Sequence, residues 1–134
     1  MKQDEISKLK DRHKNVPISN LLGVKLLDIS PGYAKVTMKL KPEYNNFHGR
    51  IFGGIVMSLA DIAFGYAVNS LKEYTVAAQF NIHFTAAVSD NDELTAEARV
   101  IKDGRRAVLA EMTVVNQNSK LIARATGTGI PTGE

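Results

Sequence analysis

One apolar segment near the middle of the chain constrains the fold more than any other feature. From Gly53 to about Leu71 the chain reads GGIVMSLADIAFGYAVNSL. This length and the scarcity of β-branched residues predict an α-helix instead of a strand. Apolar residues surround nearly the whole circumference, which is typical of a helix buried by other elements. We therefore expect a sheet that wraps around this helix.

Period-2 alternation predicts strands on both sides of that helix. Before it, strands are expected over 24–29 and 33–40, joined by a turn at Pro31-Gly32. After it, four strands are expected where apolar and polar residues alternate or where turn residues end a run. They cover 76–84, 94–101, 107–115 and 121–126. Asp103-Gly104 predicts a hairpin turn with positive φ, and the final GTGIPTGE is expected to be a tail. Strands linked in this order predict an antiparallel meander.

The order of elements predicts a single α+β domain over residues 1–134. Its core is expected at about 16–130, and residues 1–15 form a mostly solvated helical extension. With 17 basic and 14 acidic residues and no long basic block, the chain lacks a nucleic-acid-binding signature. It has no cysteine, no signal peptide and no membrane-spanning run, so we expect a cytoplasmic protein.

The glycine turn that opens the predicted helix is the first candidate for chemistry. Gly53 and Gly54 stand where the helix amides lack internal partners and where the positive end of the helix dipole lies. Such an amide can bind a carbonyl oxygen that becomes negative when its carbon is attacked. Asp61 is the second candidate, because a carboxylate on an apolar helix needs a partner or a task. It could act as a general base or as a nucleophile; the plain alternative is a structural or solvated acid.

Helix geometry limits how these two candidates can cooperate. Gly53 and Asp61 are eight residues apart, which corresponds to about 12 Å along a helix axis. Two such helices packed antiparallel across a two-fold axis would place the amide of one beside the acid of the other. Small residues at Gly54, Ser58 and Gly65 share a stripe with the acid and would permit this approach. If both residues act, the site is shared between subunits.

The run NNFHGRIFGGIVMSLAD at 45–61 resembles the signature of hotdog-fold thioesterases of the PaaI-like (phenylacetate-pathway) group. The segments AAQFNIHFTAAV, DELTAEARVIKDGRR and LIARATGTG resemble the same group, and GRIFGGIVMSLAD is also similar to the YciA-like acyl-CoA hydrolase branch. The resemblance covers roughly residues 16–130. It implies a hotdog fold, hydrolysis of an acyl-coenzyme A, a homodimer as the minimal active unit and a homotetramer as the assembly. It implies no cofactor beyond the CoA of the substrate.

The resemblance also implies roles for individual residues. The Gly53 amide, with Gly54, polarises the thioester carbonyl, Asp61 of the partner subunit is base or nucleophile, and Asn46 orients the carbonyl or the water. Phe52 departs from the PaaI-like pattern, which has histidine there, but the YciA-like pattern has an aromatic residue at that place. Ala77 stands near where some relatives carry a Ser or Thr that assists the acid.

Further substrate contacts are weaker predictions. His48 could partly replace the missing histidine, although an exposed loop histidine is the more frequent outcome. Arg50 beside the glycine turn, and Lys102, Arg105 and Arg106 around the hairpin, could hold the phosphates of coenzyme A; a solvated turn is the alternative. His13 is expected to be solvated. Because the histidines are scattered and cysteine is absent, we predict no metal site.

Two other functions stay open at this point. Phe52 and Ala77 leave room for a non-catalytic acyl-CoA-binding or regulatory protein. Hydration or dehydration of acyl thioesters ranks lower, because the relatives that catalyse it use a histidine paired with an acid. The acyl group, aromatic or short, medium or long, cannot be read from the sequence.

Overall fold

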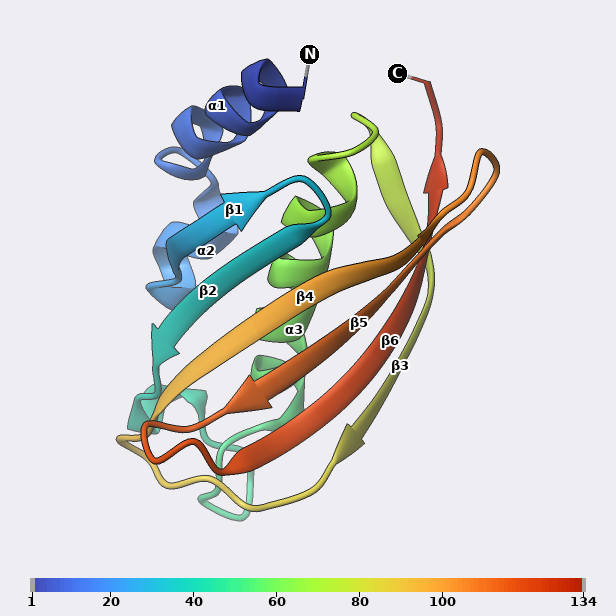
Figure 1. Cartoon of the computed structure of the whole chain (residues 1–134). Helices are drawn as coiled ribbons and strands as arrows, with labels where there is room; N and C mark the ends of the chain where they lie inside the picture. Colours follow the sequence, from blue (N-terminus) through green and yellow to red (C-terminus); the bar gives the residue numbers. More distant parts are fainter. Residues whose placement is uncertain (1, 134) are drawn as a thin grey trace.

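The computed structural model, which describes residues 2–133, has a six-stranded antiparallel sheet curved around one long helix (Figure 1). The strands are β1 (Lys25–Ser30), β2 (Tyr33–Lys39), β3 (Thr75–Phe84), β4 (Glu93–Asp103), β5 (Val108–Val115) and β6 (Leu121–Pro131). The helices are α1 (Lys2–His13), α2 (Pro17–Leu22) and α3 (Gly53–Asn69), and a 3-10 turn spans Pro42–Tyr44. The hotdog arrangement expected from the sequence is confirmed.

The strand order corrects the predicted meander. Along the sheet the strands follow the order β1-β2-β4-β5-β6-β3, so β3 lies at the far edge and pairs with β6 instead of with β4. The connection from β3 to β4 therefore crosses the end of the sheet. Within residues 2–133 this order leaves one side of β3 without a neighbouring strand, and most residues of β3 are exposed.

The central helix α3 supplies the middle of the core. Its buried residues include Leu59, Ala60, Ala63 and Phe64, all at most 1% exposed. The Phe64 ring meets Phe80 of β3 edge to face, with ring centroids 6.1 Å apart. The burial is less complete than the sequence predicted, because Asp61 is exposed and Met57 is 38% exposed. One side of α3 is therefore open in the single chain.

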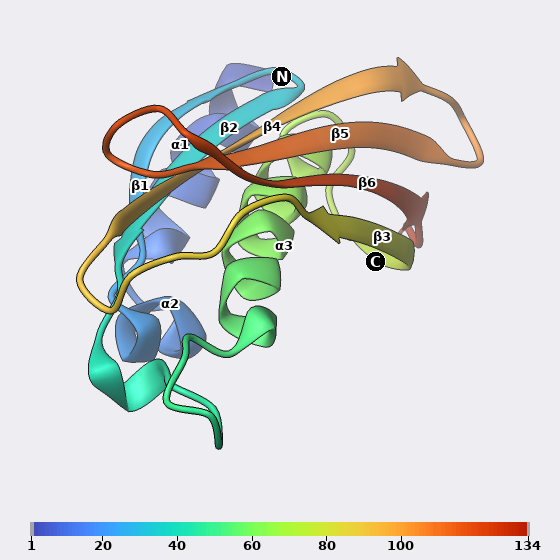
Figure 2. The ribbon, with the colours of Figure 1, turned by 90° about the horizontal axis from the view of Figure 1, so that it is seen from below.

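Helices α1 and α2 lie beside α3, on the side of the sheet that carries β1 (Figure 2). The amino-terminal extension is helical over Lys2–His13, and Ile6 anchors this helix in the core at 3% exposure. His13 corrects an expectation: it is half-buried and its Nδ1 lies 2.5 Å from the Tyr66 hydroxyl of α3. Gly23 ends α2 in the left-handed conformation, which is common for a glycine that follows a helix.

Two strand ends also differ from the sequence prediction. The expected tail from Gly127 to Pro131 continues β6, because these residues pair with β3 and place Gly127 and Gly129 against the Phe64 ring. The β4–β5 hairpin closes at Asp103 and Val108 around four residues, and Gly104 does not have positive φ. Glycine is needed there for space, since an added Cβ would lie 2.5 Å from the Ala107 carbonyl oxygen.

None of the helices formed by residues 2–133 is both long and apolar enough to cross a membrane.

Candidate active site

The first turn of α3 presents two backbone amides with no partner. Phe52 caps the helix with an extended backbone and makes no side-chain capping bond. The Phe52 carbonyl accepts from Ile55 N at 2.9 Å, and neither the Gly53 nor the Gly54 amide donates a hydrogen bond within residues 2–133. Both glycines are half-exposed. A 17-residue helix therefore begins with free donors at its positive end.

Aromatic side chains lie close to both glycines, and the one beside Gly54 leaves no room for a larger residue there. A Cβ on Gly54 would lie 2.4 Å from Cε2 of Phe52, so the Phe52 ring lies directly against the backbone of the helix start. A Cβ on Gly53 would lie 3.4 Å from Cζ of Phe84, an ordinary contact. Phe52 is 57% exposed and Phe84 is 53% exposed. Two aromatic rings thus flank the free amides.

The loop before the helix is held together by Asn46. The Asn46 Oδ1 accepts from the amides of His48 (2.9 Å) and Arg50 (3.2 Å), and Asn46 N donates to the Arg50 carbonyl at 2.6 Å. Gly49 has φ +73°, a conformation that favours glycine in this turn. With its oxygen occupied, Asn46 keeps its Nδ2 donor free among the residues that the structure describes. Asn46 can therefore donate to a ligand.

A cavity of about 220 Å³ joins the loop to the helix start. Asn46, Arg50 and Gly53 line it together with apolar residues, which are Ile51, Val56, Phe84, Ala86, Ala87, Val88 and Ile122. Three residues singled out in the sequence are thus brought together. The segment after β3 was missed as part of the site; its apolar run at 86–88 was the available signal.

His48 does not line this cavity. It is exposed, and its ring lies 4.0 Å from the ring of Phe47, which is 90% exposed. The loop hydrogen bonds hold only the His48 backbone. His48 therefore has no contact with the free amides in the single chain.

Asp61 lies two turns along α3, on the open side of the helix. Its side chain is exposed in the single chain, and neighbouring protein atoms displace enough water to raise the pKa of its carboxyl above the ordinary value of 3.8. No ion pair or hydrogen bond of the Asp61 carboxylate occurs within residues 2–133. Ser58, one turn earlier, donates to the Gly54 carbonyl at 2.7 Å and so stays within its own helix. Asp61 and Gly53 remain about 12 Å apart along the axis.

The hairpin cations lie far from the glycine turn in one chain. Lys102, Arg105 and Arg106 line a shallow cavity at the β4–β5 hairpin. An ion pair between Asp103 of this hairpin and Lys72 places it near the carboxyl end of α3, the end opposite Gly53 (Figure 1). The structure therefore separates these three cations from Asn46, Arg50 and Gly53.

Ala77 lies in β3 next to a bulge at which the pairing with β6 shifts. Its side chain is exposed, and alanine supplies no hydroxyl at this point. Within residues 2–133, no three side chains from His, Asp and Glu gather closely enough to hold a metal ion.

Comparisons with known proteins agree with this geometry. Residues 48–123 match the thioesterase superfamily. The acyl-coenzyme A thioesterase PaaI of Escherichia coli is 34% identical over 111 residues, which are 83% of this chain and 79% of that protein. The chain belongs to the thioesterase superfamily. The matched range begins in the glycine loop and includes α3, so it contains both the free amides and Asp61.

Solved structures support the same assignment of the chain to the thioesterase superfamily. The Escherichia coli PaaI protein from the phenylacetic acid degradation operon superposes with a TM-score of 0.91 at 30% identity, covering 97% of this chain and 95% of that one. A Streptococcus mutans protein bound to acetyl-CoA gives a TM-score of 0.78 at 27% identity, covering 81% of this chain and 88% of that one. The predicted family, fold and enzyme class, a thioester hydrolase, are therefore confirmed.

Proposed function

We propose that this thioesterase hydrolyses acyl-CoA to a free acid and coenzyme A. The observation that carries the proposal is the pair of free amides at Gly53 and Gly54, which open a long helix beside a cavity. Donors fixed in this way stabilise an oxyanion without having to reorganise during the reaction. The PaaI relative, named as an acyl-coenzyme A thioesterase, supports the choice of substrate class.

In the proposed reaction the thioester carbonyl oxygen accepts a hydrogen bond from the Gly53 amide, assisted by Gly54. Asp61 either takes a proton from a water that attacks the carbonyl carbon or attacks that carbon itself. The tetrahedral intermediate collapses by breaking the carbon–sulfur bond, and CoA leaves as the thiolate. Where Asp61 attacks first, water then cleaves the mixed anhydride. The free Nδ2 of Asn46 is suited to orient the carbonyl or the water.

We propose that two subunits share each site. Within one chain, Asp61 is separated from the Gly53 amide by about 12 Å along α3. The open side of α3 and the unpaired edge of β3 both suit association with a second copy. In an antiparallel pair of α3 helices, the partner's acid approaches this chain's amides. The proposed assembly is a homotetramer of two such dimers. We place it in the cytoplasm, because a chain without cysteine suits a reducing compartment.

Hydrolysis is tested by measuring thiol release from acetyl, phenylacetyl, octanoyl and palmitoyl-CoA. We expect turnover of at least one of these and formation of its free acid. Binding of CoA without any product would favour the binding-protein alternative instead. Consumption of an enoyl-CoA with the thioester intact would favour a hydratase, which the phenylalanine at position 52 argues against.

Replacing Gly53 by proline tests the oxyanion role. Proline removes the amide N–H, and it is tolerated at the first position of a helix. The extended conformation of Phe52 suits a residue that precedes proline. We expect kcat to fall by about 10²- to 10³-fold, the usual cost of one oxyanion donor.

The matched control for this variant is Gly53→Ala. It keeps the N–H, and its Cβ makes only an ordinary contact with Phe84 at 3.4 Å. Turnover of the alanine variant is expected to stay near that of the native enzyme. Equal losses in both variants would mean that the glycine supplies space and not a hydrogen bond.

We propose that the hairpin cations of one subunit bind the phosphates of a CoA molecule whose thioester lies at the glycine turn of the partner subunit. Arg105→Ala combined with Arg106→Ala should raise the KM for acyl-CoA about tenfold, a free-energy change near 1.4 kcal/mol, with kcat nearly unchanged. The KM of the native enzyme should rise with salt more steeply than that of the variant, because screening weakens exposed charge contacts. Lys25→Ala, an exposed cation on β1, is the control and should leave KM unaltered. An unchanged KM in the double variant would assign these residues to a solvated turn.

A further inference from the structure

The connection from β3 to β4 forms one wall of the cavity at the glycine turn. It runs over residues 85–92 and crosses the end of the sheet near the start of α3 (Figure 1). Residues 86–88 line the cavity together with Asn46 and Gly53. In the part of the chain that the structure describes, these three residues make no backbone–backbone hydrogen bond. The wall is therefore held in place from its two ends.

The start of the wall is held by Thr85. Its amide donates to the Ile122 carbonyl at 2.8 Å, and its hydroxyl donates to the Leu121 carbonyl at 2.9 Å. Both acceptors are the first residues of β6. Thr85 thus continues the pairing of β3 with β6 by one residue beyond the strand.

The end of the wall is held by Asp92, a carboxylate that is only 8% exposed. Its Oδ2 accepts from Ser89 N at 2.9 Å, and its Oδ1 accepts from Gln117 Nε2 at 2.9 Å. The Asp92 amide also donates to the Ser89 carbonyl at 3.1 Å. The hydrogen bonds from Ser89 and Gln117 hold the pKa of the Asp92 carboxyl below its ordinary value of 3.8. The group is therefore ionised at neutral pH.

Asp92 also joins two other segments to the wall. Gln117 belongs to the turn between β5 and β6, and its Oε1 accepts from Glu93 N at 3.0 Å. The Asp92 carbonyl accepts from Leu40 N at 2.8 Å. Leu40 follows β2 and leads into the loop that carries Asn46. Asp92 therefore connects one wall of the cavity with the segment that leads to the other wall.

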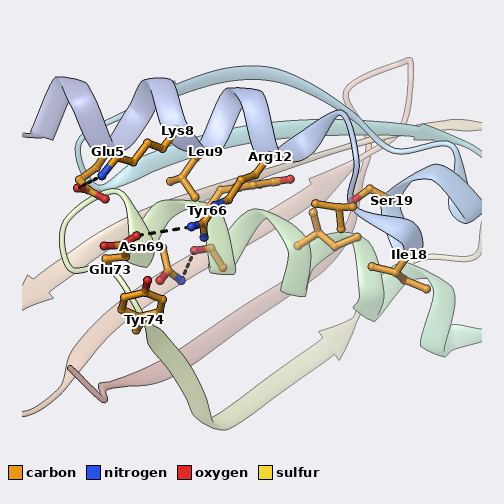
Figure 3. A pocket seen from close by; sticks show the side chains of 13 residues that line it. Glu5, Lys8, Leu9, Arg12, Ile18, Ser19, Tyr66, Asn69, Glu73 and Tyr74 are labelled. Atoms are coloured by element: carbon orange, nitrogen blue, oxygen red, sulfur yellow. Dashed lines mark hydrogen bonds and ion pairs between the residues drawn. The ribbon is translucent and has the colours of Figure 1, made fainter. Parts of the chain in front are cut away.

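The opposite half of α3 is held by different contacts. There the helix borders a pocket beneath α1 and α2, where Arg12 of α1 pairs with Glu73 at 3.9 Å (Figure 3). Asn69 Nδ2 donates to the Gly65 carbonyl at 2.8 Å in the same region. None of these contacts involves residues 85–92. A shift of the wall would therefore alter the cavity at Gly53 and leave the other half of α3 in place.

We propose that Asp92 is a positioning residue for thioester hydrolysis. It holds residues 86–88 against the first turn of α3, so that the cavity directs the thioester carbonyl toward the Gly53 amide. This role rests on the proposed acyl-CoA hydrolysis at the same cavity. Asp92 touches neither the substrate nor the attacking water and acts through the wall alone. Small displacements of a bound substrate slow a reaction strongly even when their cause is remote.

Asp92→Asn should lower kcat about tenfold and leave KM within about twofold. Asparagine has one acceptor oxygen, and its amide group faces a donor, so the hydrogen bond from either Ser89 or Gln117 is lost. The reaction slows because the wall moves, whereas the hairpin cations proposed to bind CoA are unchanged. Thiol release from the best acyl-CoA, measured well below the Tm of each variant, gives both constants. A rise in KM at native kcat would contradict a role at the reacting group.

Gln117→Glu tests the same contact from the other side. Alone, it places a second carboxylate beside Asp92 and should also lower kcat. Combined with Asp92→Asn, it restores a matched pair, because the introduced amide donates to the introduced carboxylate while its oxygen still accepts from Ser89. The double variant should regain kcat to within about threefold of the native value. Losses that multiply in the double variant would overturn the assigned pairing.

Ser70→Ala is the matched control for the loss of buried hydrogen bonds. Ser70 is 0% exposed, and its Oγ accepts from Gly32 N at 2.8 Å and donates to the Ala67 carbonyl at 2.6 Å. It lies at the carboxyl end of α3, away from Gly53. This control should lower Tm and keep kcat within about twofold. An equal fall of kcat in Ser70→Ala and Asp92→Asn would reduce Asp92 to a source of general stability.

Hydrogen–deuterium exchange shows where the chain loosens. In Asp92→Asn, exchange should accelerate over residues 86–92, while α3 and β5 keep their native protection. If Asp92→Asn does not fold, Gln117→Ala replaces it, because Gln117 is exposed; it should show the same exchange pattern and lower kcat about threefold. Native exchange together with native kcat would overturn the positioning role and leave hydrolysis intact. A native enzyme that hydrolyses no acyl-CoA would instead overturn the proposed function.

Discussion

Asp61→Asn is expected to lower kcat by about 10²- to 10⁴-fold while the protein remains folded. The range is the usual contribution of a positioned acid–base group. Asparagine has nearly the same size and hydrogen-bonding reach, but it can neither remove a proton from water nor form an anhydride. Thiol release from the best acyl-CoA measures the loss, and circular dichroism monitors the fold. Retention of native turnover would exclude Asp61 from the reaction.

The pH dependence of the same residue follows from its environment. Desolvation raises the pKa of Asp61 above 3.8, and the reaction needs the ionised form. The native rate should therefore fall, as pH is lowered, at a higher pH than an ordinary aspartate would give.

Ionisation of Asp61, which the reaction needs, is expected to lower the stability of the fold. A raised folded pKa means that Asp61 stabilises the fold most below its unfolded pKa and that this contribution is lost as pH rises through the folded pKa. Asp61→Asn should therefore raise Tm at neutral pH but not in acid. A higher Tm of the variant at all pH values would contradict this account.

Mixing two inactive variants tests whether subunits share the site. A dimer of one Gly53→Pro subunit and one Asp61→Asn subunit contains one site with both defects and one intact site, if each site draws on two chains. Unfolding and refolding an equal mixture makes half of the dimers heterodimers, and each heterodimer has one intact site out of two. Activity should therefore recover to roughly a quarter of the native value. At the losses expected here, this is about 25-fold or more above the activity of either variant alone. A site contained within one chain gives no recovery, because each subunit then carries one defect.

Phe64→Ala is expected to give the largest loss of stability among single substitutions. Phe64 is 1% exposed, meets Phe80 edge to face, and lies against Gly127 and Gly129 of β6. Removing a buried phenylalanine costs about 3–5 kcal/mol, a large part of the 5–15 kcal/mol that stabilises a typical domain. Urea unfolding at fixed protein concentration measures the change.

Phe47→Ala is the matched control for this substitution. Phe47 is 90% exposed, so its removal should alter the free energy of unfolding by less than about 0.5 kcal/mol. A loss from Phe64→Ala that is no larger than that of the control would mean that β6 and α3 are held together by other contacts.

The sequence alone was sufficient for the elements that have a strong local pattern. The helix starting at Gly53 and the strands around it follow from apolar periodicity, and their predicted boundaries lie within about two residues of the observed ones, except at the carboxyl end of β6. The pairing of β3 with β6 did not follow, because periodicity identifies a strand but not its neighbour. Gly127 and Gly129 were expected in a tail because glycine has no side chain and so gives no apolar alternation. Their small size matters only in the folded chain, where the Phe64 ring lies against them.

The candidate site was predicted in part. Asn46, Arg50 and Gly53 lie close together along the chain, and the structure brings them to one cavity. The packing of α1 beside α3 was not anticipated, since it requires α1 to fold back so that His13 reaches Tyr66, fifty-three residues later in the sequence. No local pattern encodes such a contact. His13 was expected to be solvated because its neighbours in sequence are polar.

The exposed edge of β3 has a consequence beyond catalysis. Alternate residues of this ten-residue strand present backbone donors and acceptors along the open side, and the strand contains neither lysine nor proline, which commonly protect such edges. An uncovered edge of this kind recruits any extended segment, so a lone chain is at risk of aggregation. If a second copy covers the edge, the same association that completes the site keeps the chain dispersed. Dilution would then reduce specific activity and shelf life together.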